Sequence, residues 1–388
     1  MADSNRLHSI NTSRILRTIW LNPGISRIKV AEMLDLDRST VTKIMQVILE
    51  NGLVVTAGKN TEQSGVGRRQ INLRINEALG AVLGIEIQES SYIAVITSVE
   101  GFVHHSFDGK HTITRETIVP QLLSLIAQAK VFCLENDLFL LGVGIGLPGI
   151  VDPYTGTIIR SNSLHITEPY EIRAEIEKLC VETVFVENDA NCCCWGELAF
   201  QTENRNRNFI AVLGEFRDNL PGTPEHHGLA IGLGLVIRGR VLHGDHFTSG
   251  EFRSVLASPE TGQFKLPYSD LRSLPGNPDL LQNVYQELSE NLAFLINCID
   301  FTKILFAGDI PAHPANLKEI MENAIVTNWI YDLDRKFNIE FSEHGNKSVC
   351  IGAAGLFVEK LFSVPDIADR FQELVGFDLY EQILKRKG

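Results

Sequence analysis

The residues with the most informative chemistry lie in one short stretch near the N-terminus, residues 37–50. The stretch predicts a helix with Arg38, Thr42, Lys43 and Gln46 on its outer side and with Ser39 and Thr40 in its first turn. These side chains can donate hydrogen bonds to phosphates and to base edges. Because no acidic residue follows Asp37 until Glu50, the outer face suits the major groove of DNA.

The surrounding elements would hold this helix in place. A first helix is expected over residues 11–21, and Ser26 is a good N-cap for a second. Asp37 would cap the third helix, whose inward side is an apolar stripe that ends near Asn51 and Gly52. The stripe consists of Val41, Ile44, Ile48 and Leu49. Three short helices in this order are typical of a helix-turn-helix.

A wing is expected directly after the third helix. Residues 53–55 and 71–75 are apolar enough for two strands, and the segment between them is polar and rich in glycine. Arg68 and Arg69 end this segment. Because narrow minor grooves attract arginine, we expect both to contact the minor groove or its phosphates.

The charge is distributed unevenly along the chain. Of its 35 basic and 48 acidic residues, residues 1–76 hold 11 and 6, a net of +5, and the rest hold 24 and 42, a net of −18. A basic head on an acidic body is expected when only one domain contacts phosphate. The alternative is that the three-helix segment mediates only protein contacts.

The composition favours a protein of the reducing cytoplasm. Seven cysteines are an odd number, and none has the CxxC spacing. The N-terminus lacks the apolar run of a signal peptide, and no stretch of 18 apolar residues is present. We therefore expect a cytoplasmic protein with no membrane partner.

Beyond residue 76 the pattern is α/β. Two strands are expected over residues 80–96, a helix over 116–136 and a buried strand over 140–145. A strand at 184–186 leads into the helix that carries Cys192, Cys193 and Cys194. A second series of strands begins near residue 209, which predicts two lobes with a cleft between them.

The chain resembles the ROK family of repressors and sugar kinases, in its transcriptional-regulator branch. The motifs occur in family order: the wing, then Gly144 to Asp152, Glu187 to Asn191 with Gly196 and Glu197, and Gly232 to Gly239. The resemblance implies a winged helix-turn-helix at residues 1–76 and a two-lobed, actin-like, sugar-kinase-like body. Its lobes would span residues 77–205 and 206–388, the second with the C-terminal helices.

The resemblance also indicates which chemistry is lost. Where family kinases have Asp-x-Gly-x-Thr, this chain has Glu86 to Ser90, with Gln88 and Glu89 inside the loop, and the second phosphate loop has become Gly228-Leu229-Ala230. Glycine lets the backbone approach phosphate, and Glu89 adds negative charge. We therefore expect no ATP binding, no catalysis and no cofactor.

The family's zinc site has also been lost from the sequence. Ser254 stands where the family has a zinc-binding histidine, and no cysteine follows until Cys298. Zinc needs about four such ligands, so we expect no metal. For Cys192, Cys193 and Cys194 packing is the favoured role and metal or redox chemistry the alternative, since consecutive helical residues point in different directions.

Four positions match sugar contacts of the family: Ser163, Asn188, Asp189 and Glu251. Asp189 matches the catalytic base of the kinases, and without ATP its carboxylate could hold a sugar hydroxyl without reacting. The alternative is that Asn188 and Asp189 persist only as a helix cap.

The sequence thus predicts a transcriptional regulator, most simply a repressor of carbohydrate-metabolism genes. Its partners would be a double-stranded DNA operator and a carbohydrate effector, and it would act as a homodimer or a dimer of dimers. Two other functions stay open: a regulator whose body answers to a protein or a non-sugar ligand, and an active sugar kinase that binds DNA.

Overall fold

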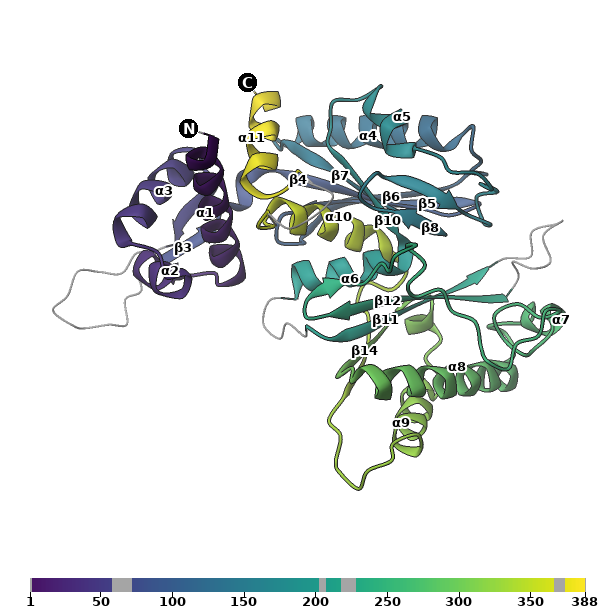
Figure 1. The fold of residues 1–388 in the computed structure, drawn as a ribbon. Helices are drawn as coiled ribbons and strands as arrows, with labels where there is room; N and C mark the ends of the chain where they lie inside the picture. Colours follow the sequence, from purple (N-terminus) through teal and green to yellow (C-terminus); the bar gives the residue numbers. More distant parts are fainter. Residues whose placement is uncertain (1, 58–71, 202–206, 218–227, 366–373, 388) are drawn as a thin grey trace.

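The computed structural model describes residues 2–57, 72–201, 207–217, 228–365 and 374–387. It contains a small N-terminal head and a body of two lobes, with the C-terminal helix between head and body (Figure 1). This is the mixed α/β architecture that the sequence predicts.

The head is a winged helix-turn-helix. Its helices are α1 (Ala2–Leu21), α2 (Arg27–Leu34) and α3 (Arg38–Glu50), and its strands are β1 (Ile25–Ser26), β2 (Val54–Ala57) and β3 (Asn72–Ile75), in the sheet order β1-β3-β2. Ser26 caps α2 by accepting from Lys29 N, and Asp37 caps α3 by accepting from Ser39 N and Thr40 N, as predicted. The structure differs from the prediction in two details: α1 begins well before residue 11, and β1 was not foreseen.

The first lobe is built on a five-stranded sheet of order β10-β7-β4-β5-β6. Its strands are β4 (Ala81–Ile87), β5 (Ser91–Ser98), β6 (Val103–Lys110), β7 (Leu140–Leu147) and β10 (Val184–Asn188). β4, β7 and β10 are parallel, and β4, β5 and β6 form an antiparallel meander. A small hairpin of β8 (Ile150–Asp152) and β9 (Thr157–Arg160) precedes α5 (Ile172–Glu177).

The second lobe repeats this plan with the order β13-β12-β11-β14-β15. Its strands are β11 (Phe209–Arg217), β12 (Gly228–Ile237), β13 (Arg240–Val241), β14 (Lys303–Gly308) and β15 (Asn338–Phe341). The helices α7 (Tyr268–Leu271), α8 (Pro278–Ile299) and α9 (Leu317–Thr327) belong to this lobe, and α8 and α9 pack against each other.

Two helices cross at the centre of the body, and they exchange lobes. α6 (Asp189–Phe200) packs on β11 and β12 of the second lobe, whereas α10 (Ser348–Leu361) packs on β4 and β7 of the first. The sequence-based boundaries at residues 205 and 206 assign each helix to the other lobe. The order of the elements along the chain does not indicate this exchange, because each of the two helices packs on the sheet of the other lobe and not on the sheet that precedes it in the sequence.

The crossing is so close that backbone meets backbone. A Cβ at Gly352 of α10 would lie 1.9 Å from the carbonyl oxygen of Cys192 on α6. On the opposite side of α10, a Cβ at Gly84 or at Gly144 would lie 1.9 Å or 1.8 Å from a carbonyl oxygen of that helix. Only glycine fits at these three points, so α10 is held tightly between α6 and the first sheet.

Cys192, Cys193 and Cys194 of α6 lie in this region, and they are buried in the hydrophobic core that surrounds this helix. Burial raises the pKa of each thiol, which keeps the three groups neutral. Among the described residues, no group of three or more His, Cys, Asp or Glu side chains is placed to hold a metal ion.

The head is joined to the body through a shared hydrophobic core. α11 (Gly376–Lys387) packs on α1, where Ser13 Oγ accepts from Phe377 N at 2.9 Å. The rings of Trp20 and Phe362 stack with centroids 5.0 Å apart, and Arg17 pairs with Glu359 at 3.0 Å. These contacts attach α1 directly to the C-terminal end of α10.

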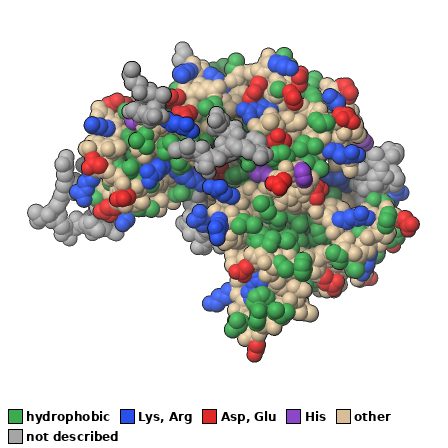
Figure 2. Space-filling view, in the orientation of Figure 1, with side chains coloured by type: hydrophobic (Ala, Val, Ile, Leu, Met, Phe, Trp, Pro, Cys, Tyr) green, Lys and Arg blue, Asp and Glu red, His purple; other side chains and the backbone are tan. Residues whose placement is uncertain are grey.

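Basic side chains gather where head and body meet (Figure 2). A cavity of about 570 Å³ lies there between α1, both lobes and the end of α10. Its basic lining residues are Arg6, Arg17, Arg207, Arg238, Arg240, His243 and Lys360.

One described helix, α4 (Ile118–Glu135), is long and apolar enough by length and composition to cross a membrane. Seven of its residues are buried, and they belong to the core of the first lobe together with residues of β4 and β7. Its apolar character is therefore accounted for by packing on the sheet.

We expect Gly352→Ala to destabilise the body. Alanine favours a helix by about 1 kcal/mol over glycine, but a Cβ placed 1.9 Å from a backbone oxygen forces α6 and α10 apart. Overpacking of this kind costs about 1–3 kcal/mol or more, so a net loss should appear in urea unfolding.

Gly276→Ala is the matched control, because its Cβ would approach only Ser273 O, at 3.3 Å. Its free energy of unfolding should stay within about 0.5 kcal/mol of the wild-type value. Equal stability of the two variants would contradict a crossing that tolerates only glycine.

Candidate functional site

The outer face of α3 matches the predicted DNA-binding surface. Five of the predicted residues are exposed and Thr40 is half-buried; the exposed ones are Arg38, Ser39, Thr42, Lys43 and Gln46. Val41, Ile44 and Ile48 face the core of the head as predicted, together with Met45. The predicted wing residues Arg68 and Arg69 lie outside the described residues.

Local hydrogen bonds fix the N-terminal end of this face. Asp37 accepts from Ser39 N at 2.9 Å and from Thr40 N at 3.4 Å, and Ser39 Oγ also donates to it. The bonds from Ser39 hold the pKa of the Asp37 carboxyl below its usual value, so Asp37 stays ionised. The first turn of α3 is thus rigid before any ligand binds.

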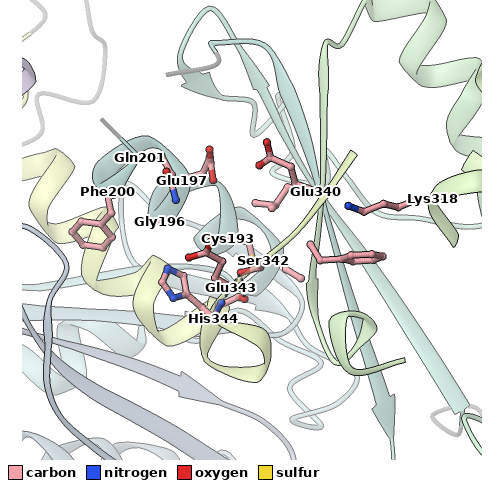
Figure 3. A pocket seen from close by; sticks show the side chains of 14 residues that line it. Cys193, Gly196, Glu197, Phe200, Gln201, Lys318, Glu340, Ser342, Glu343 and His344 are labelled. Atoms are coloured by element: carbon pink, nitrogen blue, oxygen red, sulfur yellow. Dashed lines mark hydrogen bonds between the residues drawn. The ribbon is translucent and has the colours of Figure 1, made fainter. Parts of the chain in front are cut away.

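One cavity is lined by the C-terminal half of α6 and another by its N-terminal end, and only the second of these contains residues predicted to bind an effector. The cavity of Figure 3, about 280 Å³, lies between α6 and the ends of β14 and β15. Two of its three acidic residues, Glu197 and Glu340, pair with the buried Lys303. None of the residues expected to bind an effector lines this cavity.

The other cavity brings all four expected effector residues together. It has a volume of about 380 Å³, within the usual range for small-molecule sites. Ser163, Asn188 and Asp189 line it from the first lobe or the start of α6, and Glu251 lines it from the second lobe. We call this cavity the inter-lobe pocket.

Asn188 has a structural role as well as a place in the pocket. Its Oδ1 accepts from Asn191 N at 3.1 Å and so caps α6, while its Nδ2 donates to Gly149 O at 2.9 Å. Asn188 therefore caps α6 and also lines the pocket, so capping and a place in the pocket do not exclude each other. The cap also fixes where Asp189, the first residue of α6, enters the pocket.

The Asp189 carboxyl lies in an acidic environment. Its Oδ1 accepts from Ala190 N at 2.7 Å. Burial, and then the charge of Glu215, raise the pKa of Asp189 to about 8, so its carboxyl is protonated at neutral pH. Burial also raises the pKa of Glu251. Protonated carboxyls can donate as well as accept, which suits the hydroxyls of a sugar.

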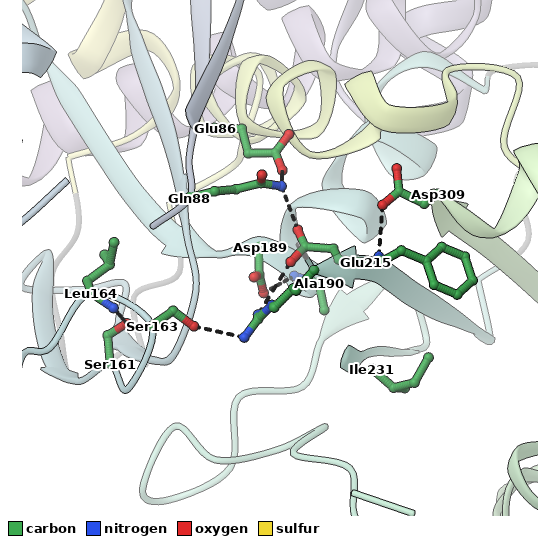
Figure 4. Close-up of polar contacts among 12 residues, drawn as sticks. Glu86, Gln88, Ser161, Ser163, Leu164, Asp189, Ala190, Glu215, Ile231 and Asp309 are labelled. Atoms are coloured by element: carbon green, nitrogen blue, oxygen red, sulfur yellow. Dashed lines mark hydrogen bonds and ion pairs between the residues drawn. The ribbon is translucent and has the colours of Figure 1, made fainter. Parts of the chain in front are cut away.

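The place of the lost phosphate loop is occupied by the protein's own side chains (Figure 4). Gln88 Nε2 donates to Glu86 Oε1 at 2.7 Å and to Glu215 Oε1 at 2.9 Å, which links the two lobes. Burial and the nearby Glu215 raise the pKa of Glu86 well above its usual value. The sequence identifies Glu89 as a negative charge that would repel phosphate. In the structure, the hydrogen bond from Gln88 to Glu215 connects the two lobes at this position.

At the position of the family's zinc-binding histidine, Ser254 is buried and hydrogen-bonded both to its own loop and to α8. Its N–H donates to Gln263 O at 2.8 Å, and its Oγ accepts from Leu256 N and Asn291 Nδ2. The side chain is thus used to order the loop after Glu251.

Sequence reasoning missed the two arginines and the glutamate of the inter-lobe pocket, Arg160, Arg217 and Glu215. Arg217 Nη1 donates to Ser163 Oγ across the pocket at 3.0 Å. Glu215 and Arg217 point to the same side of β11 because they are two residues apart. That spacing was the available signal, but it does not indicate which face of the strand meets the other lobe.

Comparison with known proteins agrees with this architecture. The winged helix-turn-helix DNA-binding family matches residues 9–55, and the ROK family matches residues 83–263. The xylose repressor of Bacillus spizizenii is 23% identical, over 94% of this chain and 99% of its own. The transcriptional dual regulator NagC of Escherichia coli is 26% identical over 64% of this chain and 58% of its own.

Solved structures share the fold. A ROK family transcriptional regulator described as a homolog of the E. coli MLC protein superposes with a TM-score of 0.72, at 19% identity, over 98% of this chain and 99% of its own. A ROK glucokinase from Streptomyces griseus, solved with glucose and AMPPNP, has a TM-score of 0.56 at 19% identity and covers 71% of this chain and 99% of its own.

These matches and the geometry define the class of protein: a winged helix-turn-helix DNA-binding head on a two-lobed body with the fold of sugar kinases. Within that class, residues 83–263 of the body match the ROK family and residues 9–55 of the head match the winged helix-turn-helix family, in agreement with the sequence-based expectation.

The raised pKa of Asp189 predicts how stability depends on pH. Between the unfolded value near 4 and the folded value of about 8, the folded protein holds a proton that the unfolded chain has lost. This contribution to the free energy of unfolding therefore falls as the pH rises, by at most about 1.4 kcal/mol per pH unit for one proton.

Urea unfolding at several pH values from about 5 to 8 should show a shallower decline for Asp189→Asn than for the wild type. Asp245→Asn serves as the control because it removes a carboxyl that lies outside the pocket lining. Asn191→Asp is unsuitable because it would add a carboxyl. A decline of equal slope in wild type and Asp189→Asn would mean that Asp189 titrates normally.

Proposed function

We propose that the protein is a transcriptional repressor of carbohydrate-metabolism genes. In this proposal the head binds a double-stranded operator, and a carbohydrate in the inter-lobe pocket changes the affinity for DNA without being phosphorylated. The observation that carries it is the combination, in one chain, of an exposed donor-rich α3 and a pocket with polar residues from both lobes.

The DNA-binding part rests on the surface of α3. Arg38, Thr42 and Lys43 are exposed on a helix whose buried side fixes it in the head. We place these residues in the major groove, with Ser39, Thr40 and Gln46 beside them, and Arg68 and Arg69 at the adjacent minor groove. The xylose repressor and NagC, which resemble this chain, are named for regulation of this kind.

A homodimer would present two heads to a two-fold operator, with half-sites separated by whole turns of DNA. The second lobe has apolar side chains available for such contact, since Phe294 is 63% exposed and Ile330 82% exposed. The site of action would be the cytoplasm, where the operator is accessible.

Absence of kinase activity is the second part of the proposal. Gln88 bonds to Glu86 and Glu215 where a phosphate loop would need open backbone, and Leu229 replaces a loop threonine. A nucleotide would have to break this link before its phosphates could reach the backbone of the loop. A coupled assay that detected ATP-dependent phosphorylation of a hexose, abolished by Asp189→Asn, would establish the alternative of an active kinase.

A continuous mechanical path supports communication between the pocket and the head. Asn188 and Asp189 begin α6, α6 packs against α10, and the end of α10 contacts α1 through Glu359 and Phe362. A ligand that favours one arrangement of the lobes would shift α6, together with the second sheet, against α10 and thereby move the head.

Operator binding should depend on the outer face of α3. We expect Arg38→Ala and Lys43→Ala each to weaken operator binding by about 1–3 kcal/mol. Where the lost contact is to a phosphate, the slope of log affinity against log salt concentration should also decrease in magnitude by about one. Fluorescence anisotropy with labelled operator at several salt concentrations measures both.

Lys110→Ala removes a charge of the same kind from the first lobe, far along the chain from the head, and serves as control. Its affinity should match the wild type. Unchanged binding by both α3 variants would exclude α3 as the helix that contacts DNA.

The effector response should depend on Asp189. Asp189→Ala should strongly weaken release of the operator by the sugar that stabilises the wild type, because a carboxyl that can donate to and accept from a sugar hydroxyl is lost; each such neutral hydrogen bond is worth about 0.5–1.5 kcal/mol. Operator affinity without sugar should stay unchanged. Release at the same sugar concentration in the variant would favour the remaining alternative, a body that answers to a protein or to a non-sugar ligand.

A further inference from the structure

The inter-lobe pocket contains cationic groups that a neutral sugar does not need. Arg160 lines it from β9 of the first lobe, and Arg217 lines it from β11 of the second. Arg160 Nε donates to Asn162 Oδ1 at 3.3 Å, so its side chain lies along the wall that carries Asn162 and Ser163. Arginine on both sides of one small pocket is the arrangement that binds carboxylates and phosphates.

Arg217 reaches across the pocket to the first lobe. Its Nη1 donates to Ser163 Oγ at 3.0 Å, and its Nη2 lies 3.4 Å from Glu215 Oε2, a long contact for an ion pair. The guanidinium has five N–H donors, so these two contacts use only part of its capacity. Its side chain is 27% exposed, which leaves it open to the pocket.

The acidic partner of Arg217 is shared with another group. Glu215 Oε1 accepts from Gln88 Nε2 at 2.9 Å, and Gln88 also donates to Glu86. Glu215 is therefore anchored to the link between the lobes and cannot turn fully toward Arg217. An anion in the pocket could approach the guanidinium from the side that faces Ser163.

The other acids of the pocket would oppose an anion less than their number suggests. Burial raises the pKa of Asp189 to about 8, and it also raises the pKa of Glu251. A protonated Asp189 can donate a hydrogen bond to a ligand oxygen at neutral pH, and it carries no repelling charge.

We propose that the effector is a sugar that carries an anionic group, a carboxylate or a phosphate, and that Arg217 is the residue that selects it. The inference rests on the proposed sugar-binding function of the same pocket. The hydroxyls of the ligand would face Asn188, Asp189 and Glu251, and its anionic end would displace Ser163 as the partner of Arg217, with Arg160 at the opposite wall.

The test is a binding comparison on the full-length protein. Glucuronate, galacturonate and glucose 6-phosphate are titrated beside glucose and galactose, by thermal shift and by calorimetry, with wild type and variants. In the wild type at least one anionic probe should bind about tenfold or more tightly than its neutral parent. The uronates and the phosphate distinguish the two sources of charge.

The variants isolate the role of the guanidinium. Arg217→Gln keeps a donor for Ser163 but removes the charge, so the anionic preference should fall to less than about threefold. Arg217→Lys should retain part of it. Arg272→Gln, an exposed arginine of the second lobe outside the pocket lining, should retain all of it. The melting temperatures without ligand verify that each variant folds.

The outcomes separate this inference from the proposed function. If neutral and anionic sugars bind equally, and Asp189→Asn abolishes both, the pocket binds sugar but Arg217 does not select charge. If the anionic preference survives in Arg217→Gln, another residue selects it and the inference is wrong. If no probe of either kind raises the melting temperature, both the inference and the proposed sugar effector are overturned.

Discussion

The close crossing of α6 and α10 is the constraint on which the rest of the structure depends. Gly352 allows the two backbones to touch, and Gly84 and Gly144 let α10 rest directly on the first sheet. Small side chains on α6, including Cys192 and Cys193, keep the crossing close. Because packed backbones cannot slide gradually, the first sheet and α10 should move as one body, and α6 with the second sheet as the other.

This division explains why the pocket and the head can influence each other. The pocket lies at the N-terminal end of α6, and the head is attached to the C-terminal end of α10. The pocket and the head are therefore each connected to a different one of the two crossing helices. Polar links among the described residues also join the lobes, among them Gln88 to Glu215, Ser163 to Arg217, and Glu187 to His243 at 2.8 Å. Glu187 directly precedes Asn188, so the pocket wall is itself held by one of these links. An effector changes DNA affinity only if it favours one arrangement of these links over another.

Sequence reasoning succeeded where the signal was local. The caps Ser26 and Asp37 begin their helices as predicted, because a cap needs only its own side chain and the next few amides. The expected residues Ser163, Asn188, Asp189 and Glu251 line one cavity. They could be predicted because the chain keeps the motifs of the family in the same order. The exchange of α6 and α10 between lobes could not be foreseen, since the periodicity of a helix indicates which face is buried but not against which sheet. The same limit hid the docking of α11 on the head and the reach of Arg217 across the pocket.

The link made by Gln88 also bears on how the two lobes of the kinase-like fold are held together. In a kinase, bound phosphates lie between the lobes and contribute contacts to both. Here an amide contacts Glu86 on the first sheet and Glu215 on the second, so the protein supplies that contact itself. The arrangement is stable only if the acids are not all ionised, and the raised pKa values of Glu86 and Asp189 meet that condition. The lobes are therefore held together at neutral pH without ligand, and the free part of the pocket, near Ser163 and Arg217, is where a ligand can still change their arrangement.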